Sequence, residues 1–171
     1  MFTGVLLFPS VDSKIPAALQ PSRDVVDTSL DLSLNLFYFL TGQAAYNFAI
    51  RLRSPAARYT VFAPSEAAFV ALGSNFDFLV NTAEGRVELA RILEYHVLDT
   101  MLFSTDLKDG LTARTIEGGT VEFSTDFAGA LFINGARIEG KDFLATNGVV
   151  HSIDRKFWFF VLNVCIFQEV F

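Results

Sequence analysis

The apolar residues of this chain change from helical to strand spacing at Gly110. After this glycine, apolar and polar residues alternate, which is typical of half-buried strands. Asn134-Gly135 lies between two such runs and predicts a type I′ hairpin, because both central residues of that turn need positive φ. The expected strands are 112–116, 120–124, 131–133, 137–139 and 149–153, with a further tight turn at Asn147-Gly148.

Helical spacing prevails before Gly110. Thr82 is expected to cap a helix whose apolar-leaning face runs from Val87 to His96. Another helix is expected from about Ser33, with Ser33 as its N-cap, although the alternation over 30–36 taken alone fits a strand. Further helices are expected over 43–52 and after Ser65, and one helical turn over 104–108.

Helices followed by antiparallel strands predict an α+β fold, and 171 residues suit one domain. The expected divisions are an irregular leader over 1–29, a domain over 30–157 and an apolar tail over 158–171 that is assigned to no element. The leader is expected to be irregular because it holds Pro9, Pro16 and Pro21 among scattered polar residues.

Composition excludes several classes of function. The formal net charge of -6 argues against a nucleic-acid partner, which needs a basic surface. One cysteine, Cys165, allows no internal disulfide, and with two histidines it allows no zinc site of the Cys/His type. No metal or cofactor is therefore expected.

Both ends of the chain are apolar. Met1–Phe8 lacks a basic leader and a small-residue cleavage site, so it is not a convincing signal peptide. The run over 157–171 is shorter than a membrane span and is interrupted by Asn163, Gln168 and Glu169. Membrane contact is expected only if this tail is part of an anchor.

Three segments in order resemble the fasciclin domain family. They are YTVFAPSEAAF at Tyr59–Phe69, ILEYHVL at Ile92–Leu98 and ATNGVVHSID at Ala145–Asp154. The resemblance implies a wedge of antiparallel β-strands packed with several helices, in secreted or surface-tethered adhesion and matrix proteins. It therefore implies an extracellular or cell-surface location and non-catalytic binding of a matrix or cell-surface protein, a polysaccharide or a second copy.

The resemblance also suggests site residues. The partner-binding candidates are Tyr95, His96, Asp142 and Phe143. The expected structural signature is Phe62, Pro64, Asn147, Gly148, His151 and Asp154. Alternative roles stay open, because a histidine at a helix C-terminus is favoured by the helix dipole, and an aspartate is common in turns.

The alternative function is a small-molecule-binding protein or an enzyme that uses His96, His151 and nearby carboxylates in a cleft. The chain has no Gly-x-Ser-x-Gly elbow and no phosphate-binding loop. The expectation is therefore that it is not an enzyme.

Overall fold

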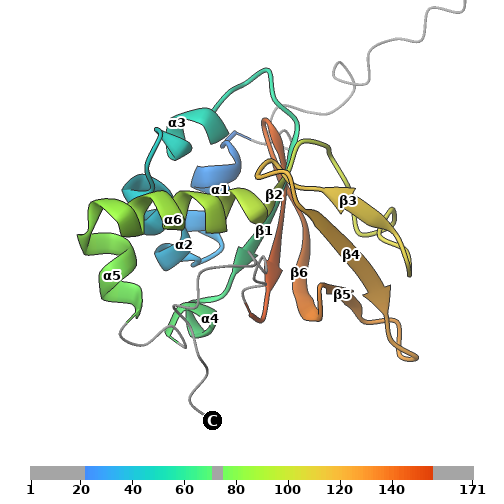
Figure 1. Cartoon of the computed structure of the whole chain (residues 1–171). Helices are drawn as coiled ribbons and strands as arrows, with labels where there is room; N and C mark the ends of the chain where they lie inside the picture. Colours follow the sequence, from blue (N-terminus) through green and yellow to red (C-terminus); the bar gives the residue numbers. More distant parts are fainter. Residues whose placement is uncertain (1–21, 71–74, 156–171) are drawn as a thin grey trace, which may run out of the picture.

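The computed structural model describes residues 22–70 and 75–155 as a layer of helices against a curled sheet (Figure 1). The leading residues of the expected leader, the tail over 158–171 and Cys165 lie outside the described residues. The helices are α1 (Val25–Asp31), α2 (Asn35–Gln43), α3 (Phe48–Leu52), α4 (Glu66–Val70), α5 (Asn75–Asn81) and α6 (Ala83–Tyr95). The strands are β1 (Tyr59–Pro64), β2 (Val97–Leu98), β3 (Thr112–Arg114), β4 (Thr120–Thr125), β5 (Leu131–Ile133), β6 (Ala136–Ala145) and β7 (Gly148–Ile153). The predicted α+β class is confirmed.

One sheet of seven strands runs in the order β2-β1-β7-β6-β5-β4-β3. A single bridge between Leu98 and Thr115 joins its two ends, so the sheet is nearly closed into a barrel. The sheet is mixed, because β1 pairs in parallel with β7 while the other neighbours are antiparallel. The expectation of a purely antiparallel sheet is wrong for this pair, since the helices α4, α5 and α6 and β2 separate β1 from the later hairpins.

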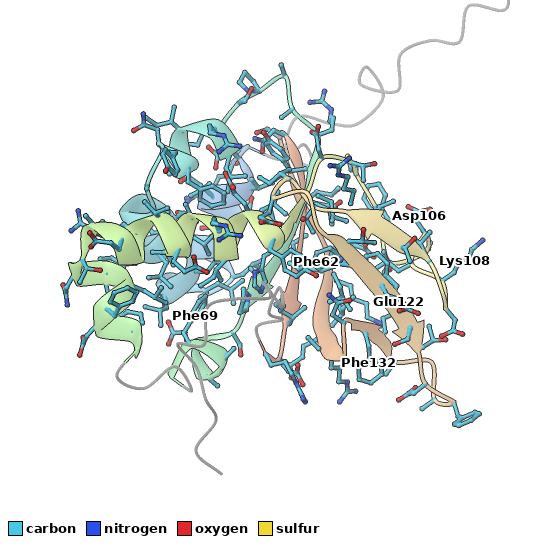
Figure 2. All side chains as sticks on the ribbon, in the orientation of Figure 1. Phe62, Phe69, Asp106, Lys108, Glu122 and Phe132 are labelled. Carbon is cyan, nitrogen blue, oxygen red and sulfur yellow. The ribbon has the colours of Figure 1, made fainter. Side chains whose placement is uncertain are left out.

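Strand β1 separates two apolar cores. Val61 and Ala63 point into the core under the helices, together with Phe69. Phe62 points the opposite way, into the core inside the curled sheet. Figure 2 shows Phe69 within the helical layer and Phe62 against the sheet. Because the strand is buried on both faces, it reads as a nearly continuous apolar run rather than as an alternation.

Helix α1 lies where the end of the irregular leader was expected. The Asp24 carboxylate caps it by accepting hydrogen bonds from the backbone N–H groups of Val26 and Asp27, both at 2.9 Å. Val25 and Val26 are buried in the core under the helices. The expectation of irregular structure is thus wrong for residues 25–29.

Ser33 ends one helix rather than beginning the next. Its φ is 61°, in the left-handed region, whereas an N-cap residue has an extended backbone. The N–H of Ser33 bonds to the carbonyl of Leu30, and the N–H of Leu34 bonds to that of Ser29. This pair of bonds is a Schellman motif that closes the C-terminus of α1. The prediction of Ser33 as an N-cap is therefore wrong.

The other helical predictions have mixed outcomes. Thr82 caps α6 as predicted, because its hydroxyl accepts a 2.9 Å hydrogen bond from the N–H of Gly85. The helix expected over 43–52 is broken by positive φ at Tyr46 and Asn47, next to a bond from the N–H of Ala45 to the carbonyl of Arg86 on α6.

Two predicted turns also have different outcomes. The segment 104–108, expected to be one helical turn, forms a non-helical turn. The hairpin at Asn134-Gly135 is confirmed, because these residues have φ values of 46° and 78°.

We expect that Gly148→Ala destabilises the domain by about 1–3 kcal/mol, because the added Cβ would lie 2.2 Å from the carbonyl oxygen of Tyr59. Gly42→Ala is the matched control, since nothing lies within 4 Å of its added Cβ and its position in α2 favours alanine by about 0.5–1 kcal/mol. Urea unfolding of both variants checks this. Equal midpoints for the two variants would contradict the close approach of β1 and β7.

Candidate functional site

Asn147 lies at the junction of four chain segments and is fully buried. Its Oδ1 accepts a 3.0 Å hydrogen bond from the N–H of Val25, at the start of α1. Its Nδ2 donates to the carbonyls of Leu52 at 2.6 Å and Ser54 at 3.1 Å, at the end of α3. Its own carbonyl accepts from the N–H of Tyr59 at 3.0 Å, at the start of β1. The side-chain amide therefore holds α1 and α3, and the backbone carbonyl holds β1, to the turn between β6 and β7.

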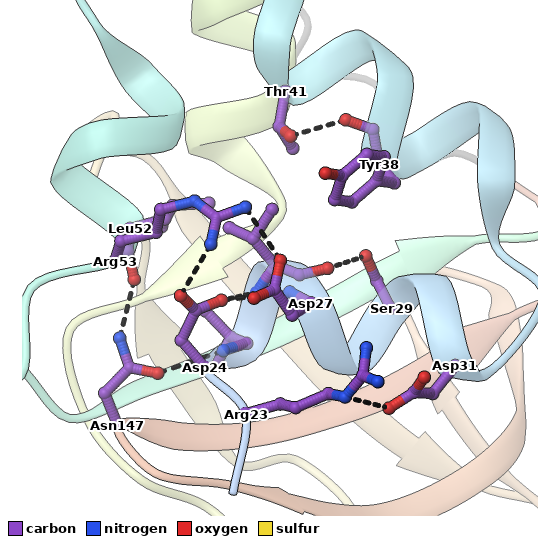
Figure 3. A network of polar contacts seen from close by, with 12 residues as sticks. Arg23, Asp24, Asp27, Ser29, Asp31, Tyr38, Thr41, Leu52, Arg53 and Asn147 are labelled. Atoms are coloured by element: carbon purple, nitrogen blue, oxygen red, sulfur yellow. Dashed lines mark hydrogen bonds and ion pairs between the residues drawn. The ribbon is translucent and has the colours of Figure 1, made fainter.

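Ion pairs surround this junction on the side of α1 and α3. The guanidinium of Arg53 contacts Asp24 at 2.9 Å and Asp27 at 2.8 Å (Figure 3). The hydrogen bond from Arg53 holds the pKa of Asp27 below its ordinary value, although burial acts in the opposite direction. These pairs are partly exposed, so they orient the two helices more than they stabilise the fold.

His151 is fully buried inside the curled sheet. Its ring stacks on Phe62 with centroids 5.2 Å apart. Its Nδ1 accepts from the N–H of Asp142 at 3.2 Å, so Nε2 carries the proton and donates to the carbonyl of Leu102 at 3.0 Å. Burial lowers the pKa of His151 below its ordinary value, against the opposing effects of the Leu102 bond and the Asp142 charge. The neutral ring thus holds β7 to the bulge in β6 and to the 99–104 segment.

Asp142 lies in an irregular stretch of β6, where the register to β7 shifts twice. Its φ of 61° is unusual for a residue other than glycine. Its carboxylate accepts hydrogen bonds from both the N–H and the hydroxyl of Ser104. Burial raises the pKa of Asp142, but the bonds from Ser104 outweigh it and the pKa lies below its ordinary value. Its neighbour Phe143 is half-buried against the core under the helices.

Tyr95 and His96 lie at the C-terminal end of α6, as predicted. Both side chains are buried. The Tyr95 hydroxyl donates to the carbonyl of Thr120 at 2.9 Å and accepts from Nδ2 of Asn134 at 3.1 Å. The His96 Nδ1 lies 2.7 Å from the carbonyl of Ile92 in its own helix. Tyr95 therefore connects α6 to β4 and to the β5–β6 hairpin.

Pro64 and Asp154 lie at one end of the parallel pair of strands, where Pro64 pairs with Ile153, the residue before Asp154. The N–H of Ser65, directly after Pro64, bonds to the carbonyl of Ile153 at 2.9 Å. The Asp154 carboxylate accepts a 2.9 Å bond from the N–H of Arg137 and pairs with Arg155 at 3.1 Å. It therefore closes the end of β7 onto β6.

An open groove of about 820 Å³ lies along the seam where the sheet fails to close. One wall is the run 111–118, which contains β3, and the other is formed by Asp99, Thr100 and Leu102. Arg51 and Tyr59 complete its lining. None of the ten signature and candidate residues named from the sequence lines this groove. It was not found from the sequence, because its two walls lie in unconnected segments.

Comparisons with known proteins cover most of the chain. A sequence model of the fasciclin domain matches residues 33–157. The chain belongs to the fasciclin domain family. Human periostin is 32% identical over 98 residues, which are 57% of this chain and 11% of periostin. The rabbit (Oryctolagus cuniculus) transforming growth factor-beta-induced protein ig-h3 is 34% identical over 100 residues, 57% of this chain and 14% of that protein.

Two further matches cover a larger share of the chain. The protein sll1483 of Synechocystis is 29% identical over 138 residues, 80% of this chain and 76% of that protein. The solved structure of a FAS1 domain pair from the insect cell adhesion molecule Fasciclin I matches with a TM-score of 0.66 and 19% identity. That match covers 81% of this chain and 51% of the other, and it shows the shared fold. The resemblance inferred from three motifs is thereby confirmed.

In this fasciclin domain the three motifs meet around one interior. Phe62, Tyr95 and Ile153, one from each motif, lie in the core inside the curled sheet. The family signature thus marks the residues that join the helices to the sheet. Asp24 and Ser104 take part in the contacts described above, and the Thr60 hydroxyl bonds to the backbone of Thr100 and Leu102. These three residues were missed from the sequence. Only Asp24 had a local signal in the sequence, because an aspartate followed three residues later by Asp27 is typical of a helix N-terminus.

The alternative of a His/carboxylate cleft finds no support in the geometry. The rings of His96 and His151 are both buried. The ring of His96 contacts the carbonyl of Ile92 in its own helix, and that of His151 contacts the carbonyl of Leu102. Over residues 22–70 and 75–155, no three His, Cys, Asp or Glu side chains converge as metal ligands would. Likewise, no helix in these two ranges is long and apolar enough to cross a bilayer.

We expect Asn147→Ala to cost roughly 2–4 kcal/mol of unfolding free energy, because it leaves buried backbone donors and acceptors without partners. Asn35→Ala is the control, since the Asn35 amide is exposed and makes only bonds of 3.2 and 3.3 Å. Its cost should stay within about 0.5 kcal/mol. Denaturant unfolding measures both, and a similar loss in the two variants would argue against the junction.

We expect the domain to lose stability as the pH falls below about 6.5, the ordinary value for histidine. The pKa of His151 is lowered in the folded state, so the unfolded chain binds the proton more readily and acid favours unfolding. The loss should level off once the pH lies below the folded-state pKa. His151→Gln, which cannot titrate, should show a shallower decline between pH 7 and pH 5.5 in thermal melts. Parallel declines would mean that other groups cause the effect.

Proposed function

We propose that this chain is a non-catalytic interaction module of the adhesion or matrix type, which binds a matrix or cell-surface protein, a polysaccharide or a second copy. The observation that carries the proposal is how the polar side chains of the signature and of the binding candidates are used. Asn147, His151, Asp142 and Tyr95 bond to other parts of the fold rather than facing a shared cleft. Such residues build a rigid scaffold, and recognition then falls to the surface.

The surface of the domain carries large apolar side chains that suit binding. Tyr46, Ile50 and Leu144 are more than half exposed, and Phe127 is fully exposed. Phe127 stands at the tip of the turn between β4 and β5. Oδ1 of Asp126 holds that turn rigid by accepting from the N–H groups of Ala128 at 2.9 Å and Ala130 at 2.7 Å. Exposed aromatic residues on a rigid turn are favourable anchors for a partner.

The relatives support the same class of function. Fasciclin I is described as an insect cell adhesion molecule. Two fasciclin-like arabinogalactan proteins, from Cercospora beticola and Arthroderma benhamiae, are 31% and 34% identical to this chain over the aligned residues. The chain spans only 11–14% of periostin and ig-h3, so it corresponds to one module of those longer proteins. We infer an extracellular or surface location for it on this basis.

The experiment is binding of the full chain to immobilised fibronectin, collagen, heparin and arabinogalactan, and to a second copy. We expect saturable binding to at least one of these probes, with the probe recovered unchanged. A chain that binds none of them, or that cleaves or modifies a probe, would overturn the proposal.

Asp142→Ala tests the predicted recognition residue. If a partner contacts the carboxylate, the variant binds that partner about tenfold or more weakly, as expected for loss of a charged hydrogen bond. Ser104→Ala is the matched control, because it removes the internal side-chain bond to Asp142 but keeps the carboxylate for a partner. Equal binding by wild type and Asp142→Ala would exclude Asp142 from recognition.

A further inference from the structure

The seam of the sheet is joined at one end and open at the other. The N–H of Ile116 bonds to the carbonyl of Val97 at 2.9 Å, beside the bridge between Leu98 and Thr115. Beyond this point the two edges separate into the groove of about 820 Å³. Strands that pair at one end and then part leave two facing backbone edges.

A buried threonine keeps the far wall of the groove in place. The Thr60 hydroxyl donates to the carbonyl of Thr100 at 2.7 Å and accepts from the N–H of Leu102 at 2.8 Å. Both groups thus turn toward β1 and away from β3. These bonds hold the 99–102 segment against β1, so the far wall of the groove is part of the packed fold.

No strand of the described residues pairs with the edge of β3 that faces the groove. The carbonyl of Leu111 accepts from the N–H of Phe123, and the N–H of Thr115 donates to the carbonyl of Gly119. Backbone groups alternate along an antiparallel strand, so residues 111, 113 and 115 bond to β4. The N–H and C=O groups of Thr112 and the N–H of Arg114 therefore point into the groove.

We propose that this groove binds an extended peptide segment of a partner protein, which adds as a strand to the free edge of β3. The inference rests on the proposed function and specifies the kind of partner and where it binds. Main-chain hydrogen bonds to Thr112 and Arg114 supply the contacts that define a strand. A volume of this size is in the range of known ligand sites.

The lining also determines which side chains the peptide carries. Leu111 and Ala113, together with Leu102, are half-buried against the core inside the curled sheet and form an apolar floor. Thr112 and Arg114 are exposed at the rim. A strand beside β3 therefore turns alternate residues to the floor, where apolar side chains fit, and the others to solvent.

Charge at the rim does not select a charged peptide. Arg51 pairs with Glu94, and Glu117 with Arg91. Arg114 on β3 and Asp99 on the facing wall form no ion pair among the described residues, and their opposite signs balance. The groove thus selects an extended backbone with apolar residues at alternate positions rather than a particular net charge.

The test begins with a displayed library of random dodecapeptides and the full chain as bait. We expect enrichment of sequences with apolar residues at alternate positions. One enriched peptide is then synthesised, and its binding is measured by fluorescence anisotropy. In hydrogen exchange it should slow the amides of Thr112 and Arg114. Failure to enrich any peptide, or protection only elsewhere, would overturn the inference.

Two variants at one position isolate the backbone contact. Thr112→Pro removes the N–H that points into the groove and no hydrogen bond to β4, so the peptide should bind about tenfold or more weakly. Thr112→Ala keeps that N–H and should bind within about twofold of wild type. Equal affinities of the two variants would refute strand addition, and if the proline variant does not fold, the hydrogen-exchange result decides.

The outcomes also separate this inference from the proposed function. Binding to a matrix probe without any peptide in the groove leaves the proposed function standing and removes the inference. Absence of binding to the matrix probes and to peptides alike removes both.

Discussion

The buried amide of Asn147 is the constraint on which the arrangement of this domain depends. Its donor and acceptor groups have no access to water, so each must find a partner inside the protein. The partners are backbone groups at the start of α1 and the end of α3, more than 90 residues away along the chain. These bonds fix the position of the helical layer on the sheet.

The parallel pair of β1 and β7 extends that constraint into the two cores. Val61 and Val150 face the helices, whereas Phe62 and His151 stack inside the curled sheet. Because both strands are buried on both faces, their polar residues must also bond internally. This explains why a histidine on β7 holds the bulge of β6 in place, and why Thr60 on β1 holds the loop after β2 against β1. The open seam is thus a consequence of how the centre of the sheet is packed.

The location of the reactive side chains separates scaffold from surface. The two histidines and Asp142 are the residues that the sequence suggests for chemistry. Their side chains instead form hydrogen bonds within the fold. What remains accessible are exposed apolar side chains such as Phe127 and the free backbone edge of β3. A domain built in this way is suited to binding through surfaces and edges.

Local patterns in the sequence determined the α+β class, the hairpin at Asn134-Gly135, the cap at Thr82 and the family, because each depends on residues close together in the chain. The tertiary structure decided the rest. Ser33 adopts a left-handed conformation because α1 must end there, and β1 pairs in parallel with β7 because the intervening helices return the chain to the same side. The bulge at Asp142 and the groove depend on contacts with Ser104 and Thr60, about 40 residues away. Short-range preferences carry no information about such partners, so they emerge only when distant segments pack together.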